Sequence, residues 1–93
     1  MDATFSLSVT TPENTVFSGE VVYLSVPGAG GYMGILHDHA PMISALRPGR
    51  FEVRKAEGGT PLFFTTRAPG FLELKANQAT VLLDAQDSGV LSV

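Results

Sequence analysis

The residues best suited to chemistry are the two histidines of the tripeptide His37-Asp38-His39. Side chains two positions apart on a strand point to the same side, and neutral imidazole is a common metal ligand. Asp38 adds a carboxylate between them. The tripeptide therefore offers two or three ligands, which suits weak metal binding.

A complete metal centre needs further ligands at the right spacing. Gly31, followed after five residues by His37 and His39, matches the opening of the cupin metal motif, which continues with a glutamate near position 43 or 44 and a third histidine. Ile43 and Ser44 stand there instead, and the chain has 2 histidines in all. We predict no metal and no other cofactor. A small cupin-like metal-binding protein using His37 and His39 is the alternative.

The glycines just before the histidines raise the question of a phosphate-binding loop. A dinucleotide fingerprint that starts at Gly28 and Gly30 requires glycine at position 33, where Met33 stands. A Walker motif requires a Gly-Lys pair, which the sequence lacks. We interpret Gly28, Gly30, Gly31 and Gly34 as residues that shape a tight loop between strands.

Catalytic groups are not arranged in a recognisable pattern. No serine lies in a Gly-x-Ser-x-Gly context, and no carboxylate pair has a spacing that argues for acid and base catalysis. With no cysteine there is no thiolate nucleophile and no disulfide, which suits a reducing compartment. No catalytic site can therefore be argued from these residues and their spacing.

Charge and hydropathy argue against nucleic-acid binding and against a membrane-spanning segment. The net charge is −3 and the 6 lysines and arginines are scattered, whereas a nucleic-acid surface needs a dense positive face. No apolar run approaches the ~20 residues that cross a bilayer. The first residues lack the basic and apolar regions of a signal peptide, so we expect a cytosolic-type start.

The elements that must position these residues are short β-strands. In the first, Phe5, Leu7 and Val9 share one face and polar residues occupy the other, which is typical of a half-buried strand. Arg47-Pro48-Gly49 fits a type II turn, and a tight turn is expected at residues 76–78. The expected strands cover residues 4–10, 15–18, 20–26, 50–55, 61–67, 71–75 and 79–84.

The 93 residues are enough for one domain. Turn signals recur about every eight to twelve residues, which is typical of an antiparallel sandwich or barrel. The best helical candidate, residues 40–46, is too short to stand alone and contains a proline near its start. We predict an all-β fold over residues 1–86, with a short tail at 87–93.

The region between the third and fourth expected strands is rich in apolar residues. Such residues mark either a protein interface or a plug at the end of the sandwich. Tyr32 and Met33 favour an interface because glycines flank them, whereas Ile35, Leu36 and Leu46 fit either role. The apolar residues of this region are Tyr32, Met33, Ile35, Leu36, Met42 and Ile43.

Several short motifs occur in a fixed order along the chain. They are Phe17-Ser18-Gly19-Glu20-Val21, Pro27-Gly28, Gly31-x-x-Gly34-Ile35-Leu36, and the run from His39 to Leu46 with Pro48-Gly49. This order closely resembles the epsilon subunits of bacterial-type rotary ATP synthases, over residues 4 to about 86. The resemblance implies a flattened β-sandwich of about ten short strands at the foot of the central stalk.

The resemblance also implies two partners, the gamma subunit and the membrane c-ring, with which the family's domain rotates. Position by position, the implied gamma-subunit interface is Thr11, His39, Pro41, Met42, Ile43 and Ser44. The implied c-ring interface is Gly31, Tyr32 and Met33. We expect charged substitutions at Met42 or Ser44 to weaken the complex without unfolding the domain.

The sequence departs from the family's pattern at identifiable places. Tyr32 stands where the family often has an acidic residue, so packing or a hydroxyl hydrogen bond replaces a salt bridge to a basic c-ring loop. His37-Asp38 replaces the usual Pro-Gly, and residues 67–70 replace a Ser-Gly-Gly turn. The family usually continues into a helical hairpin that restrains ATP hydrolysis, and we do not carry that activity over. The ending at 88–93 favours a natural terminus.

The resemblance therefore predicts a non-catalytic coupling subunit, peripheral on the cytoplasmic face of an inner or photosynthetic membrane. A free-standing binding module on a jelly-roll scaffold is a third interpretation of the same residues. It differs in expecting a stable monomer that is indifferent to the gamma subunit.

Overall fold

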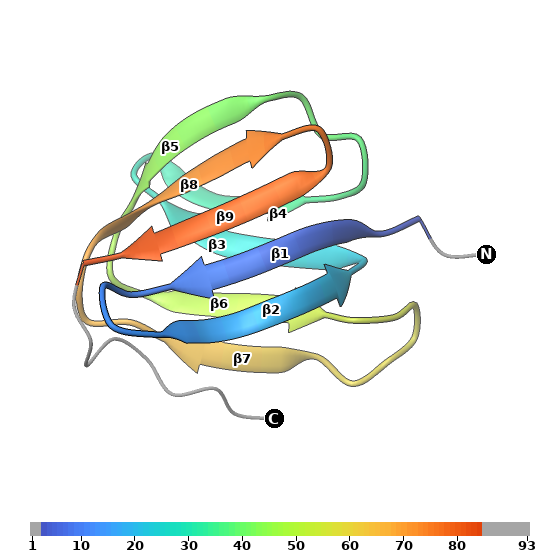
Figure 1. Ribbon diagram of the computed structural model, residues 1–93, viewed down its shortest axis with the longest axis horizontal. Helices are drawn as coiled ribbons and strands as arrows, with labels where there is room; N and C mark the ends of the chain where they lie inside the picture. The colour runs from blue at the N-terminus through green and yellow to red at the C-terminus, as the bar shows by residue number, and fades with distance from the viewer. Residues whose placement is uncertain (1–2, 85–93) are drawn as a thin grey trace.

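The computed structural model describes residues 3–84, which form nine strands and no helix. The strands follow the order β2-β1-β9-β8-β5-β3-β6-β7, and β4 pairs with β3 beside this path (Figure 1). No helix within these residues is long and apolar enough to span a membrane. The strands are β1 (Phe5–Thr10), β2 (Thr15–Val21), β3 (Tyr23–Gly28), β4 (Gly31–Ile35), β5 (Met42–Leu46), β6 (Arg50–Arg54), β7 (Leu62–Thr65), β8 (Gly70–Lys75) and β9 (Gln78–Leu83).

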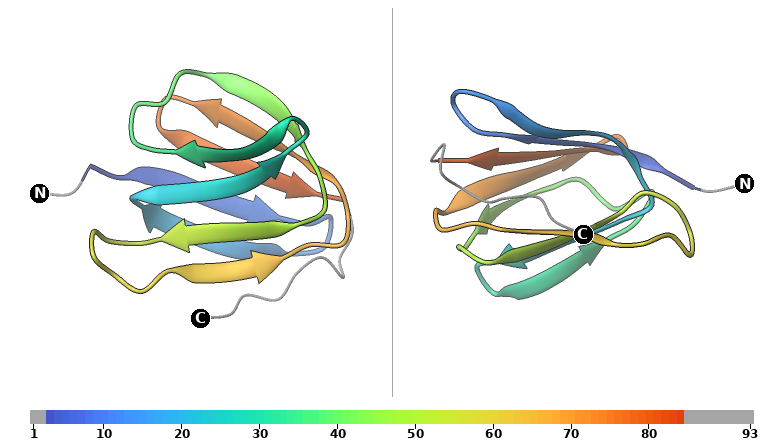
Figure 2. Two further views of the ribbon diagram at one scale, coloured as in Figure 1. Left: turned by 180° about the vertical axis from the view of Figure 1, so that it is seen from behind. Right: turned by 90° about the horizontal axis from the view of Figure 1, so that it is seen from below.

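The sheet folds over on itself into two layers, as Figures 1 and 2 show. One layer contains β2, β1, β9, β8 and β5, and the other contains β4, β3, β6 and β7. The layers are joined between β5 and β3 at the pair Gly28 and Leu46. On the opposite side, the Val22 amide donates to the Arg54 carbonyl over 2.8 Å. The expected all-β sandwich is confirmed.

The core lies between the layers and follows from the alternation in the sequence. In β1, Phe5, Leu7 and Val9 are buried while the residues between them are half-buried. In the other layer, Phe51 of β6 and Phe64 of β7 are directly opposite one another, and their buried rings stack with centroids 4.5 Å apart. Each fully buried side chain of this size stabilises the fold by about 1.5–3 kcal/mol, so the alternating pattern determines which face of each strand points inward.

The sandwich is not wholly antiparallel. Strand β1 lies between β2 and β9, antiparallel to the first and parallel to the second, with Ser6 opposite Gln78 and Thr10 opposite Leu82. The other pairings among residues 3–84 are antiparallel. The first and last described strands are therefore neighbours, which a reading of successive hairpins does not predict.

The expected break at Gly19 is wrong, because β2 runs through Gly19 to Val21. The chain turns at Val22 instead, and Val21 and Val22 are both buried. Successive residues of a strand point to opposite faces. Two successive buried residues therefore do not fit a strand that has one face exposed to solvent. They mark the corner where the chain passes from one layer to the other, and β3, which follows the corner, lies between β5 and β6 in the strand order.

The two expected turns have different outcomes. Ala76 and Asn77 have φ of 51° and 60°, as in a type I′ turn, and they join β8 to β9 as predicted. The type II turn at Arg47-Pro48-Gly49 is wrong, because Gly49 does not adopt a positive φ. A Cβ at Gly49 would lie 3.0 Å from the Pro27 Cβ and 3.3 Å from the Tyr32 hydroxyl oxygen. Gly49 therefore permits close packing instead of supplying a special dihedral.

The region between the third and fourth expected strands contains strands of its own. Strands β4 and β5 both lie within residues 27–49, and the weak helical candidate at 40–46 is mostly β5. Loops gather at two ends of the sandwich. We call the end with loops 11–14, 29–30, 47–49 and 66–69 the Tyr32 end, and the end with loops 36–41, 55–61 and 76–77 the Asn77 end (Figure 2). The tail from 85 onward, with the expected 87–93 segment, lies outside the described residues.

Candidate contact surfaces

The two histidines make separate local contacts at the Asn77 end. The His37 Nδ1 lies 3.3 Å from a carboxylate oxygen of Asp38, and the His39 Nδ1 lies 2.9 Å from the Ala40 carbonyl oxygen. Within residues 3–84, no three side chains of the metal-ligating types come together. The histidines thus belong to the hydrogen bonding of the 36–41 loop.

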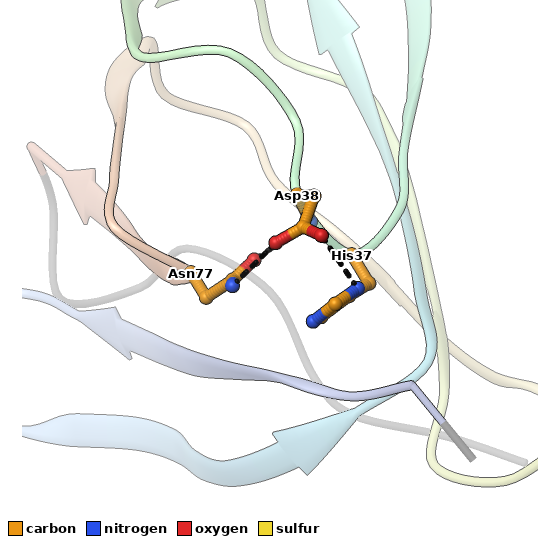
Figure 3. A network of polar contacts seen from close by, with 3 residues as sticks. All are labelled: His37, Asp38 and Asn77. Atoms are coloured by element: carbon orange, nitrogen blue, oxygen red, sulfur yellow. Dashed lines mark hydrogen bonds and ion pairs between the residues drawn. The ribbon is translucent and has the colours of Figure 1, made fainter.

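Asp38 and Asn77 hold that loop in place through two reciprocal hydrogen bonds (Figure 3). The Asp38 amide donates to the Asn77 Oδ1 over 2.7 Å, and the Asn77 Nδ2 donates to the Asp38 carboxylate over 2.8 Å. The Asn77 carbonyl also accepts from the Ser6 amide at 2.9 Å. Both residues have positive φ, which Asn and Asp tolerate. We call this arrangement the Asp38–Asn77 clasp; it ties the loop, the β8–β9 turn and β1 together.

The register of β5 separates the residues expected to form one gamma-subunit interface. Ile43 points outward and is 72% exposed. Met42 and Ser44 point inward and are half-buried, and Met42 packs against the hydrophobic core. The expectation that a charge at Met42 leaves the domain folded does not fit this geometry. His39 and Pro41 are exposed in the loop before the strand.

Thr11 lies at the Tyr32 end, far along β1 from the loop with His39 and Pro41. It is half-buried, and its hydroxyl accepts from the Asn14 amide over 3.2 Å within the β1–β2 turn. The implied gamma-subunit interface therefore has two separate parts, and other residues must join them.

An apolar row that the sequence analysis missed joins the two parts. Phe71 in β8 and Leu82 in β9 are directly opposite one another, and they are 53% and 49% exposed. Leu82 is also opposite Thr10, and Phe71 is opposite Ala45. We call Ile43, Ala45, Phe71 and Leu82 the outer apolar patch. Its signal in the sequence is a large apolar residue at the outward position of two adjacent strands, where polar residues are expected.

Tyr32 and Met33 lie on opposite faces of β4, so they cannot meet one partner together. Tyr32 points outward and is 64% exposed, while Met33 is half-buried and packs against the core. The Tyr32 hydroxyl accepts from the Arg50 amide over 3.3 Å. Gly31, at φ 132°, is exposed before it. Of the implied c-ring interface, Gly31 and Tyr32 are therefore on the surface.

These features define a class of protein: a small two-layered β-sandwich domain with large apolar side chains exposed on its surface. Residues 4–87 match the family model described as ATP synthase, Delta/Epsilon chain, beta-sandwich domain. The chain belongs to this family.

Relatives in bacteria agree with this assignment. The ATP synthase epsilon chain of Bordetella petrii is 39% identical over 82 residues, which cover 88% of this chain and 57% of the relative. That of Desulforamulus reducens is 38% identical over 87 residues, covering 94% and 64%. The chain thus spans less than two thirds of the length of these curated relatives.

Solved structures share the fold. A chain of the mitochondrial ATP synthase of Euglena gracilis superimposes with a TM-score of 0.83 at 22% identity, covering 98% of this chain and 55% of that chain. A chain of the Tetrahymena thermophila central stalk and c-ring gives 0.69 at 13% identity, with 86% and 63% covered. At these identities the likeness concerns the fold.

Proposed function

We propose that the chain is a rotor subunit of a rotary ATP synthase without catalytic activity of its own. It binds the gamma subunit and the c-ring and couples ion flow to ATP synthesis, which takes place on other subunits. Family membership and the epsilon-chain relatives support this role. The structural neighbours come from complexes whose names include the c-ring and central stalk, which supports these partners. The association with the membrane is peripheral, on its cytoplasmic face.

The observation that carries the proposal is the outer apolar patch on a two-layered sandwich. A subunit that transmits torque needs a stiff body and a broad contact. Large apolar side chains exposed on adjacent strands favour burial against another protein. The patch extends from Ile43, near the Asn77 end, to Leu82, which lies opposite Thr10 near the Tyr32 end.

We assign the gamma subunit to this patch and the c-ring to the Tyr32 end. Ile43 and Phe71 form the centre of the gamma-subunit contact, with His39, Pro41 and Thr11 at its margins. At the Tyr32 end, Gly31 and Tyr32 project beside the 47–49 loop. The two contacts involve different surfaces, so each partner is expected to bind without displacing the other.

Binding of the gamma subunit tests the proposal. Phe71→Glu places a charge at the centre of the outer apolar patch, and we expect binding at least roughly 30-fold weaker, as for a central interface residue. Thr65→Glu, on an exposed residue of β7 in the other layer, is the matched control and should bind like the wild type. Both variants should unfold like the wild type. Equal binding by Phe71→Glu and Thr65→Glu would contradict the assignment.

A further inference from the structure

At the Tyr32 end, two arginines flank the exposed ring of Tyr32. On one side of Tyr32, Arg47 lines a groove of about 220 Å³ with Gly31 and Pro48. On the other side, Arg50 lines a groove of about 420 Å³ with Phe63. Both arginines are exposed. The ring of Tyr32 therefore stands between two surface grooves, and each groove has one guanidinium group.

The Arg50 side chain is held in a definite orientation. Its guanidinium carbon lies 4.0 Å from the centroid of the Phe63 ring, and its backbone amide donates to the Tyr32 hydroxyl. Stacking uses the face of a guanidinium group and leaves its N–H edge able to donate two parallel hydrogen bonds. That geometry matches a carboxylate, and a restrained arginine loses less conformational entropy on binding one.

Within the described part of the chain, no carboxylate neutralises these two charges. Among residues 3–84, neither Arg47 nor Arg50 forms an ion pair with a carboxylate. Glu52 lines the groove of Arg50, but its carboxylate accepts from the Arg54 Nε over 2.6 Å. Unpaired positive charge thus collects on both sides of Tyr32 in a chain whose net charge is −3.

We propose that the Tyr32 end binds an acidic loop of its partner, with Arg47 and Arg50 contacting Asp or Glu side chains on the two sides of Tyr32. The inference rests on the proposed function, in which this partner is the c-ring, and it adds the sign of the partner's charge. The family resemblance implies the opposite arrangement, an acidic residue at the position of Tyr32 facing a basic loop. Here the polarity of the contact is reversed.

An anionic lipid headgroup fits these observations less well than a protein carboxylate. Attraction to an anionic membrane surface typically requires clusters of about four to eight basic residues. The Tyr32 end offers Arg47 and Arg50 together with Arg67 in the 66–69 loop, and Glu13 and Asp84 lie at the same end. Two separated guanidinium groups beside an aromatic ring are better suited to two side chains of one protein loop.

The test uses the chain in complex with the gamma subunit and the c-ring from the same source. Arg47→Glu and Arg50→Glu are combined, and binding of the gamma-bound chain to the ring is measured at several salt concentrations. We expect binding about tenfold weaker at low salt and a flatter salt dependence, because two exposed ion pairs are replaced by repulsion. Gamma binding should be unchanged. Arg67→Glu, at the same end but in neither groove, is the control and should have a smaller effect.

A second variant identifies the partner's residue directly. Arg50→Lys introduces an amine, which a carbodiimide joins to a neighbouring carboxylate as an amide. We expect a cross-link from this lysine to an Asp or Glu of the ring and none from Lys75, whose strand ends at the opposite end of the sandwich.

Unchanged or tighter ring binding by the double variant, with gamma binding intact, would overturn this inference alone. So would equal loss of binding to ring-free vesicles with anionic lipid. A wild-type chain that binds neither gamma nor the ring would overturn the proposed function as well.

Discussion

The outer apolar patch and the Tyr32 end are both exposed, yet they differ in chemistry. The patch consists of exposed apolar side chains on β5, β8 and β9, whereas the Tyr32 end presents two grooves with an arginine in each. An exposed apolar surface suits a permanent contact that excludes water, and its energy comes from burial. Exposed charges contribute less affinity and more selectivity. The difference indicates a tight contact on the patch and a charge-selective contact at the Tyr32 end.

The largest expected effect is within β5, where neighbouring residues face opposite sides and only the outward ones belong to the patch. Met42→Asp places a carboxylate against the core, and we expect the free energy of unfolding to fall by about 2–3 kcal/mol. Ile43→Asp changes an outward residue and should stay within about 0.5 kcal/mol of the wild type. Denaturant unfolding measures both. Equal destabilisation by the two variants would contradict the register.

The Asp38–Asn77 clasp supports the loop beside the patch, and we expect its loss to have an intermediate effect on stability. Asn77→Ala removes both side-chain hydrogen bonds and places alanine at φ 60°, so we expect a loss of about 1–2 kcal/mol in the free energy of unfolding. Asn77→Gly retains the dihedral and separates the two causes. If Asn77→Ala unfolds like the wild type, the clasp does not stabilise the fold.

At the Tyr32 end, the hydrogen bond from the Arg50 amide to the Tyr32 hydroxyl can be tested directly. Tyr32→Phe removes the acceptor for the Arg50 amide, which lies on an exposed part of the surface. We expect a loss of no more than about 0.5 kcal/mol in the free energy of unfolding. Hydrogen exchange at the Arg50 amide should become faster, and exchange at the Val53 amide in the same strand should not change. Unaltered exchange at Arg50 would show that the hydroxyl does not hold this amide.

The smallest effect concerns Glu20, on the outer side of the layer that carries the patch. Hydrogen bonds donated by Ser6 and then Thr4 lower the pKa of the Glu20 carboxyl below its ordinary value of 4.5. Because the folded pKa lies below the unfolded one, this stabilisation is present above about pH 4.5 and is lost as the pH falls through the folded value. An NMR titration should show the Glu20 pKa rising in Ser6→Ala. A Glu20 pKa that is the same in both proteins would contradict this cause.

Much of the fold was predictable because alternation is a local property. The buried faces of β1 and β6 follow from apolar residues at every second position, whereas in β8 and β9 the outward Phe71 and Leu82 break this alternation. The corner at Val22 was not predictable, since two adjacent valines look the same in a central strand and at a bend. The turn at Gly49 was also predicted wrongly, because Gly49 is required for close packing against Pro27 and Tyr32, which are distant in sequence.

The contact surfaces were predictable in part. The sequence order of the motifs indicated the family, and the match over residues 4–87 confirms it. The same motifs included Met42 and Met33, which pack against the core, and excluded Phe71 and Leu82, which are exposed. A motif records which residues occur together, whereas exposure depends on strand register.

The sequence by itself determined the all-β class and the family, because periodicity and motif order are properties of the linear sequence. Only the tertiary structure decided that β1 lies beside β9, that Phe71 and Leu82 join Ile43 in one patch, and that Arg47 and Arg50 flank Tyr32. These relations link residues on different strands, and strand order and register decide which of their side chains meet.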